Sequence, residues 1–152
     1  MKILLFSLFF LSCSSFHYND FKNLRYESEW AKENSILLKD GKSTQGGINF
    51  TLLKPLSSSK YLGKTYFALV LVTSPPGSGI FRDLAIFSPA IGGLKQISSI
   101  HLGDRVKVKK VEFAGEYLMV TMISHSKSDP MCCPSLLVTK KYSIKNNFQQ
   151  TQ

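Results

Sequence analysis

The chain has 152 residues, of which 43% are hydrophobic and 19% are charged, and it carries a formal net charge of +9. This length suits one domain with a real core, and the composition excludes a disordered chain. The positive charge is compatible with anionic lipids, glycans or nucleic acid. No aromatic-interleaved basic motif or helix-turn-helix pattern is present, so we expect no nucleic-acid partner and interpret the Lys-rich C-terminal third as a solvated face.

Residues 1–12 have the pattern of a secretory signal peptide. Lys2 precedes an almost unbroken apolar run, too short for a membrane-spanning helix of about 20 residues. The run ends in Phe10-Leu11-Ser12-Cys13, which resembles the bacterial lipobox, in which the cysteine becomes lipidated. The alternative is cleavage by an ordinary signal peptidase that leaves Cys13 unmodified. Ser14 resembles the residue found in lipoproteins sorted to an outer membrane. We therefore expect a lipid-anchored protein of the bacterial cell envelope with the membrane as one partner.

Residues 13–34 are expected to form the lipidated N-terminus and a tether. Phe21, Leu24 and Trp30 are spaced as on one face of a short helix. Tyr26 and Trp30 can equally pack from an extended segment, so the type of element stays open.

Residues 35–145 predict a mainly β domain with an antiparallel sheet. The segment 65–73 is apolar on both faces and predicts a central strand. The segments 105–113 and 116–124 flank Ala114-Gly115 and predict a hairpin, with a β-bulge at Lys109-Lys110. Shorter strands are expected at 35–39, 48–52, 84–87, 94–100 and 136–144, a loop at 57–59 and a polar tail at 146–152.

Three stretches carry a resemblance to a known family. They are Gly77-Ser78-Gly79-Ile80-Phe81, Leu102-Gly103-Asp104-Arg105-Val106 and Asp129-Pro130-Met131-Cys132-Cys133-Pro134-Ser135. In this order and spacing they resemble an uncharacterised family of exported bacterial lipoproteins of the LppP/LprE type. The resemblance covers about residues 36–145 and implies export and one domain, but no chemistry. Many relatives carry an acidic Gly-Asp-rich segment where this chain has Leu62-Gly63-Lys64.

The adjacent cysteines, Cys132 and Cys133, allow three interpretations. They can be two thiols packed in the core, or a disulfide with a structural or redox-sensing role. Neighbouring Cα atoms across a trans peptide are about 3.8 Å apart, below the usual disulfide limit of about 4.4 Å, so a bond is expected to need a twisted or cis peptide. The third interpretation is a metal site with His125 and Asp129, although adjacent thiolates rarely span a tetrahedral site.

His101, Asp104 and Arg105 are the residues most easily mistaken for a catalytic set. We interpret Gly103-Asp104 as a turn whose carboxylate accepts backbone N–H groups or pairs with an arginine, and Arg105 as the start of the next strand. No Ser/His/Asp pattern or paired carboxylates at glycosidase-like positions appear.

The leading hypothesis is therefore a lipid-anchored, non-catalytic binding or structural module without a cofactor, which contacts an envelope partner or ligand. The alternative is a redox- or metal-responsive protein acting through Cys132 and Cys133. A third hypothesis is an enzyme that uses a pocket near His125 and Asp129.

Overall fold

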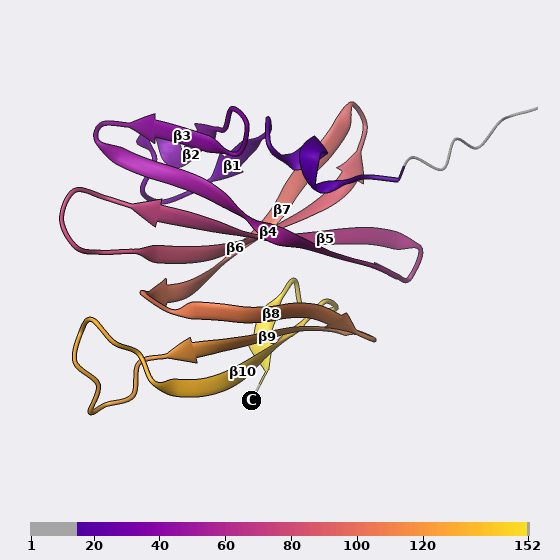
Figure 1. The fold of residues 1–152 in the computed structure, drawn as a ribbon. Coiled ribbons are helices and arrows are strands. Elements are labelled where there is room, and N and C mark those ends of the chain that lie inside the picture. The colour runs from indigo at the N-terminus through magenta and orange to yellow at the C-terminus, as the bar shows by residue number, and fades with distance from the viewer. Residues whose placement is uncertain (1–14, 152) are drawn as a thin grey trace, which may run out of the picture.

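The computed structural model describes residues 15–151 and consists of two stacked antiparallel sheets with an N-terminal segment above them, which contains a third sheet of two antiparallel strands (Figure 1). The first sheet has the strand order β3-β4-β5-β6-β7 and the second has the order β11-β10-β9-β8. The strands are β1 (Arg25–Glu27), β2 (Ser35–Leu37), β3 (Lys42–Gln45), β4 (Ile48–Tyr61), β5 (Lys64–Ser74), β6 (Phe81–Ala90), β7 (Gly93–Asp104), β8 (Lys107–Ala114), β9 (Tyr117–Ser124), β10 (Leu136–Ser143) and β11 (Gln149–Thr151).

The prediction of a mainly β fold with antiparallel pairing is confirmed. The helical part of the described chain consists of two 3₁₀ turns, η1 (Tyr18–Phe21) and η2 (Lys32–Asn34). Neither turn is long or apolar enough to cross a bilayer. Of the two alternatives left open for the N-terminal segment, the structure has a single 3₁₀ turn that ends at Phe21 and an extended segment that contains Tyr26.

The core lies on both faces of β5, which is the middle strand of the first sheet. Phe67, Leu69 and Leu71 point to one face and pack against the N-terminal segment. Ala68 and Val70 point to the other face and pack against the second sheet. Side chains of a strand alternate between faces, so a strand buried on both sides must be apolar throughout. The prediction of a central strand at 65–73 is confirmed.

The N-terminal segment is part of the domain, so the prediction of a tether over residues 13–34 is wrong for its described portion. Phe21, Tyr26 and Ala31 are buried in the cluster that covers one face of the first sheet. The Tyr26 hydroxyl donates a hydrogen bond of 2.9 Å to the Phe21 carbonyl, and both residues are fully buried. Burial of Phe21 alone stabilises the fold by roughly 1.5–3 kcal/mol. Without this layer, β5 and β6 would expose their apolar face to water.

Two further boundaries differ from the prediction. β4 runs through Pro55 and through the serines at 57–59, where a loop was expected, with a register shift between Leu53 and Ser57. The expected polar tail at 146–152 instead contains the buried Phe148 and β11, which pairs with β10. In both segments the tertiary packing overrides a polar local composition.

The hairpin of β8 and β9 has the predicted form. Ala114 pairs with Tyr117, and Gly115 in the turn has a φ of +59°, a conformation that glycine adopts without steric cost. The register shifts between Val108 and Lys110, which confirms the predicted bulge. This hairpin therefore follows from local sequence alone.

Candidate functional site

Three connections between strands meet at one end of the molecule. Residues 75–80 join β5 to β6, residues 105–106 join β7 to β8, and residues 125–135 join β9 to β10. β5 and β7 end on the same side because both run antiparallel to β6. β8 starts where β9 ends, because Lys107 pairs with Ile123. These three connections, at the left of Figure 1, carry most of the stretches that support the lipoprotein resemblance. We call this region the disulfide end.

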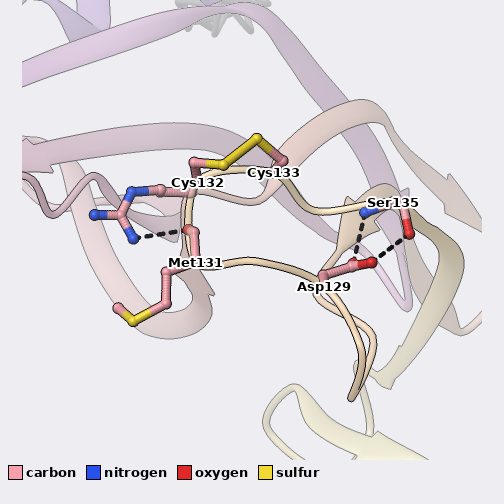
Figure 2. The surroundings of a disulfide bond; sticks show 6 residues. Asp129, Met131, Cys132, Cys133 and Ser135 are labelled. Atoms are coloured by element: carbon pink, nitrogen blue, oxygen red, sulfur yellow. Dashed lines mark hydrogen bonds between the residues drawn. A yellow bond between two sulfur atoms is a disulfide. The ribbon is translucent and has the colours of Figure 1, made fainter.

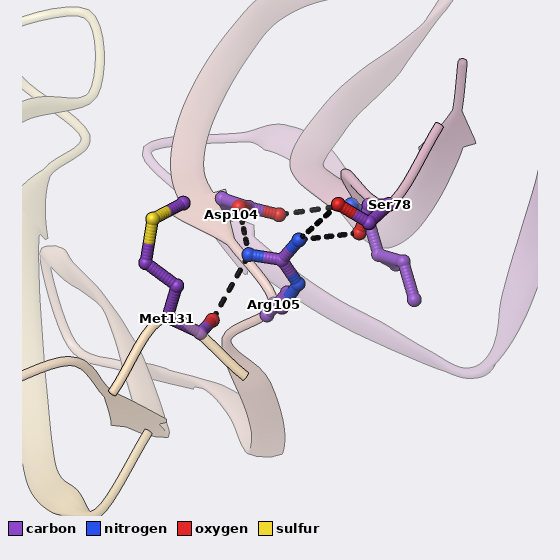
Figure 3. Close-up of polar contacts among 5 residues, drawn as sticks. Ser78, Asp104, Arg105 and Met131 are labelled. Atoms are coloured by element: carbon purple, nitrogen blue, oxygen red, sulfur yellow. Dashed lines mark hydrogen bonds and ion pairs between the residues drawn. The ribbon is translucent and has the colours of Figure 1, made fainter. Parts of the chain in front are cut away.

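The guanidinium group of Arg105 holds the three connections together (Figure 3). Nη1 donates to Asp104 Oδ2 at 2.8 Å and to the carbonyl of Met131 at 2.9 Å. Nη2 donates to the carbonyl of Ser78 at 2.6 Å and to its hydroxyl at 3.0 Å. The Arg105 side chain is only 15% exposed. The planar guanidinium, with donors in fixed directions, is suited to bridge acceptors on three separate segments.

Asp104 also binds the connection between β5 and β6, and we call the contacts of Arg105 and Asp104 together the Arg105 clamp. Asp104 Oδ1 accepts the N–H of Ile80 at 2.8 Å, and the Arg105 N–H donates to the Ile80 carbonyl at 2.6 Å. Both oxygens of Asp104 are therefore engaged, with a backbone N–H and with Arg105, as the structural interpretation of this carboxylate predicted. The prediction of a turn at Gly103-Asp104 is wrong, because both residues belong to the end of β7. The prediction that Arg105 opens the next strand is wrong, because β8 begins at Lys107. Arg105 instead lies in the left-handed region, with a φ of +50°, and Gly103, two residues before it, has a φ of +131°.

The loop of residues 125–135 is closed at its base by Asp129 (Figure 2). Asp129 Oδ2 accepts the N–H groups of Ser126 and Ser135, each at 2.8 Å, and Oδ1 accepts the Ser135 hydroxyl at 2.7 Å. Hydrogen bonds from Ser126 and Ser135 favour the charged form and lower the pKa of Asp129 well below its ordinary value. The carboxylate therefore acts as the organiser of the loop.

Cys132 and Cys133 form a disulfide at the tip of this loop (Figure 2). Their Cα atoms are 3.8 Å apart, the spacing of a trans peptide. The Cys133 N–H donates to the carbonyl of Pro130 at 3.0 Å, which closes a turn. Both cysteines are exposed and only Pro134 is buried, so the interpretation as thiols packed in the core is wrong. Met131, beside them, is 75% exposed.

The residues proposed as metal ligands are engaged otherwise. The sulfur atoms of Cys132 and Cys133 are joined to each other, and the oxygens of Asp129 accept hydrogen bonds within the loop. His125 is half-buried just after β9. Across residues 15–151, no three metal-ligating side chains come together. The candidate lipidation site, Cys13, lies outside the described residues.

A hydrogen bond that we did not predict from the sequence joins a half-exposed histidine to a buried aspartate on the first sheet. His101 Nδ1 is 2.8 Å from Oδ1 of Asp83, whose side chain is 8% exposed. Burial raises the pKa of Asp83, and the hydrogen bond with His101 partly opposes the shift. The pair borders a cavity of about 530 Å³ that Glu27, Glu29 and Glu33 also line. The sequence signal that could have indicated this pair is Asp83, a charged residue directly before the apolar run of β6.

We compared the chain with known families, curated proteins and solved structures. No family model, no curated protein and no solved structure matches the chain.

Proposed function

We propose that this chain is a lipid-anchored protein of the bacterial cell envelope, sorted to the outer membrane, that works as a non-catalytic binding module through its disulfide loop. The observation that carries the proposal is the Arg105 clamp, which fixes an exposed loop by its main chain. Arg105 binds the Met131 carbonyl, while the Met131 side chain stays 75% exposed. The anchoring part of the proposal is supported by the apolar leader and Cys13.

A clamped loop is a favourable contact surface for a physical reason. Binding through a mobile loop loses free energy because its side chains and backbone must be ordered, whereas a loop ordered in advance avoids much of this cost. Asp129 fixes the base of the loop and Arg105 fixes its middle. The disulfide between Cys132 and Cys133 restricts the tip further. The exposed thioether and sulfur atoms can then contact an apolar surface of a partner.

Lipidation is tested by labelling cells with an alkyne analogue of palmitate. We expect the wild-type chain to take up the label and Cys13→Ala to lose it. The matched control is Cys132→Ser/Cys133→Ser, which should keep the label because those sulfur atoms are not acylated. A labelled Cys13→Ala chain, or a wild-type chain without label, would contradict the anchoring proposal.

Binding is tested by placing a photo-crosslinking amino acid at position 131 in the lipidated chain in intact cells. We expect a discrete adduct that disappears when Arg105 is replaced by Ala. The control position is Lys42, which is exposed on β3. The proposal fails if position 131 gives no adduct beyond the control, or if Arg105→Ala leaves the adduct unchanged while hydrogen exchange shows that the loop has opened.

A redox role is the second candidate, and the exposure of both cysteines favours it. A dithiol reductant of the envelope could transfer two electrons to the pair, so that Cys132 and Cys133 become thiols while the reductant forms its own disulfide. Trapping thiols with a maleimide of high mass measures the reduced fraction in cells. A binding module predicts a pair that stays oxidised, whereas a redox role predicts a reduced fraction that changes with oxidant stress.

A further inference from the structure

We propose that the end of the molecule opposite the disulfide loop docks on a membrane surface that carries anionic lipid headgroups. This inference rests on the proposed lipid anchor, and it adds an orientation and a lipid class to it. The docking surface consists of two hairpin tips, at residues 61–64 and 90–93, and of the lysines around them. We call this region the hairpin end.

The two tips lie together because of the sheet topology. β5 begins where β6 ends, since these neighbouring strands are antiparallel and Phe67 pairs with Phe87. The β4–β5 and β6–β7 turns therefore project from the same end of the first sheet, at the right of Figure 1. Each tip carries a large aliphatic side chain that no other residue covers: Leu62 is 80% exposed and Ile91 is fully exposed. Aliphatic side chains at hairpin tips can enter the boundary between headgroups and acyl chains.

The described chain also begins at the hairpin end. Phe16 packs edge-on against Phe67 of β5, with ring centroids 5.6 Å apart, and Phe67 lies three residues from the tip residue Lys64. Three peptide units separate Cys13 from Phe16 and span at most roughly 10 Å. A lipid on Cys13 would therefore hold the hairpin end against the membrane, because Phe16 is fixed in the fold. The disulfide end would point away from the bilayer.

The charge of the hairpin end matches an anionic surface. A cavity of about 480 Å³ lies beside the tips, between the adjoining ends of β5 and β6 and the segment 144–148. Lys64, Lys95 and Lys145 line it, and no carboxylate does. Lys145 pairs with Glu116. Among residues 15–151, Lys64 and Lys95 have no carboxylate partner. Lysines beside an apolar insertion are the arrangement expected of a protein that binds acidic lipids, and each contributes about a fivefold gain in affinity.

The docking test uses the full processed chain, purified in detergent and reconstituted into vesicles. Ile91→Trp reports insertion through quenching by brominated acyl chains, and Leu137→Trp is the matched control on the other end, where Leu137 is 66% exposed. The native Trp30 stacks on Phe81 at the start of β6 and gives the background. Vesicles of phosphatidylcholine alone are compared with equal parts of phosphatidylcholine and phosphatidylglycerol.

We expect strong quenching for Ile91→Trp in the mixed vesicles, less in phosphatidylcholine alone, and none above background for Leu137→Trp. Lys64→Gln/Lys95→Gln in the Ile91→Trp chain should remove most of the gain from phosphatidylglycerol, roughly 25-fold in affinity. Lys107→Gln/Lys109→Gln removes the same charge from β8 and should leave quenching unchanged. Circular dichroism confirms that each variant is folded.

Equal quenching at positions 91 and 137, or no dependence on phosphatidylglycerol, would overturn the docking proposal. A dimer in detergent that Leu62→Ser/Ile91→Ser converts to a monomer would also overturn it, because a second copy would then cover the tips. Palmitate labelling is scored separately. If Cys13 carries no lipid but Ile91→Trp is still quenched on anionic vesicles, the anchor proposal fails and the docking proposal stands.

Discussion

Replacing Arg105 by alanine is the most direct test of the clamp at the disulfide end. The substitution removes four hydrogen bonds, to Asp104, Met131 and Ser78. A fully buried acceptor that loses its partner costs about 1–3 kcal/mol, and removing one member of a fully buried ion pair costs about 3–5 kcal/mol. These values are upper bounds here, because Asp104 is 28% exposed and the contacts to Ser78 and Met131 lie at the surface. Water can reach Ser78 and Met131 once the loop opens, which reduces the loss. We therefore expect the free energy of unfolding to fall by about 2–4 kcal/mol.

Urea unfolding monitored by circular dichroism measures this loss, and hydrogen exchange at the Cys133 amide reports whether the loop opens. The matched control is Lys110→Ala, which breaks an ion pair with Glu112 in which both side chains are largely exposed. An exposed pair contributes at most about 1 kcal/mol. If Arg105→Ala destabilises the chain no more than Lys110→Ala does, the guanidinium does not hold the disulfide end together.

A second substitution separates the side chain of Arg105 from its backbone. Because Arg105 has a φ of +50°, any L-residue there is in a left-handed conformation that costs roughly 1–2 kcal/mol. Arg105→Gly removes both the clamp and this cost. We therefore expect Arg105→Gly to unfold at higher urea than Arg105→Ala, and the reverse order would show that the backbone conformation is not a source of instability.

Three more substitutions test other parts of the fold. Tyr26→Phe should lower the free energy of unfolding by about 1–3 kcal/mol in urea titrations, because the buried Phe21 carbonyl loses its donor; an unchanged midpoint would contradict this. The lowered pKa of Asp129 gives a loop that is fully stabilised above pH 3.8 and loses stability as the pH falls further. The protection of the loop amides, relative to their intrinsic exchange rates at each pH, should therefore fall in acid for wild type but not for Asp129→Asn. Burial raises the pKa of Asp83, so folding binds a proton and stability falls as the pH rises from 3.8 through the folded pKa. Asp83→Asn, which can still hydrogen-bond His101, should remove that slope in thermal melts, whereas a slope that persists would assign it to another group.

The local sequence pattern predicted those strands that can be recognised without knowing which strands they pair with. The segment at 65–73 is apolar on both faces, and only a central strand can bury it. The hairpin around Gly115 and the bulge near Lys109 follow from alternation and turn chemistry over a few residues. At the candidate site, the sequence likewise indicated that the Asp104 carboxylate has a structural role, and it offered a disulfide as one of three interpretations of Cys132 and Cys133.

Elements that are stabilised by residues distant in the sequence could not be predicted from the local pattern. The pattern of the N-terminal segment left a helix and an extended segment equally open, yet Phe21 and Tyr26 complete a core whose other half lies in β5 and β6. β4 continues through polar serines because its backbone pairs with β5, and backbone hydrogen bonds do not depend on side-chain polarity. Asp83 and His101 are 18 residues apart and meet because β6 pairs with β7.

The amino-acid order by itself determined the strand-rich class, the central strand and the hairpin around Gly115, since each depends on residues close together in the chain. Only the tertiary structure decided that Arg105 binds both Ser78 and Met131, and that Leu62 and Ile91 project from the opposite end. These arrangements depend on strand order and register, which set where each connection emerges. A side chain's partners across 26 or 27 residues are fixed by that geometry and by no local pattern.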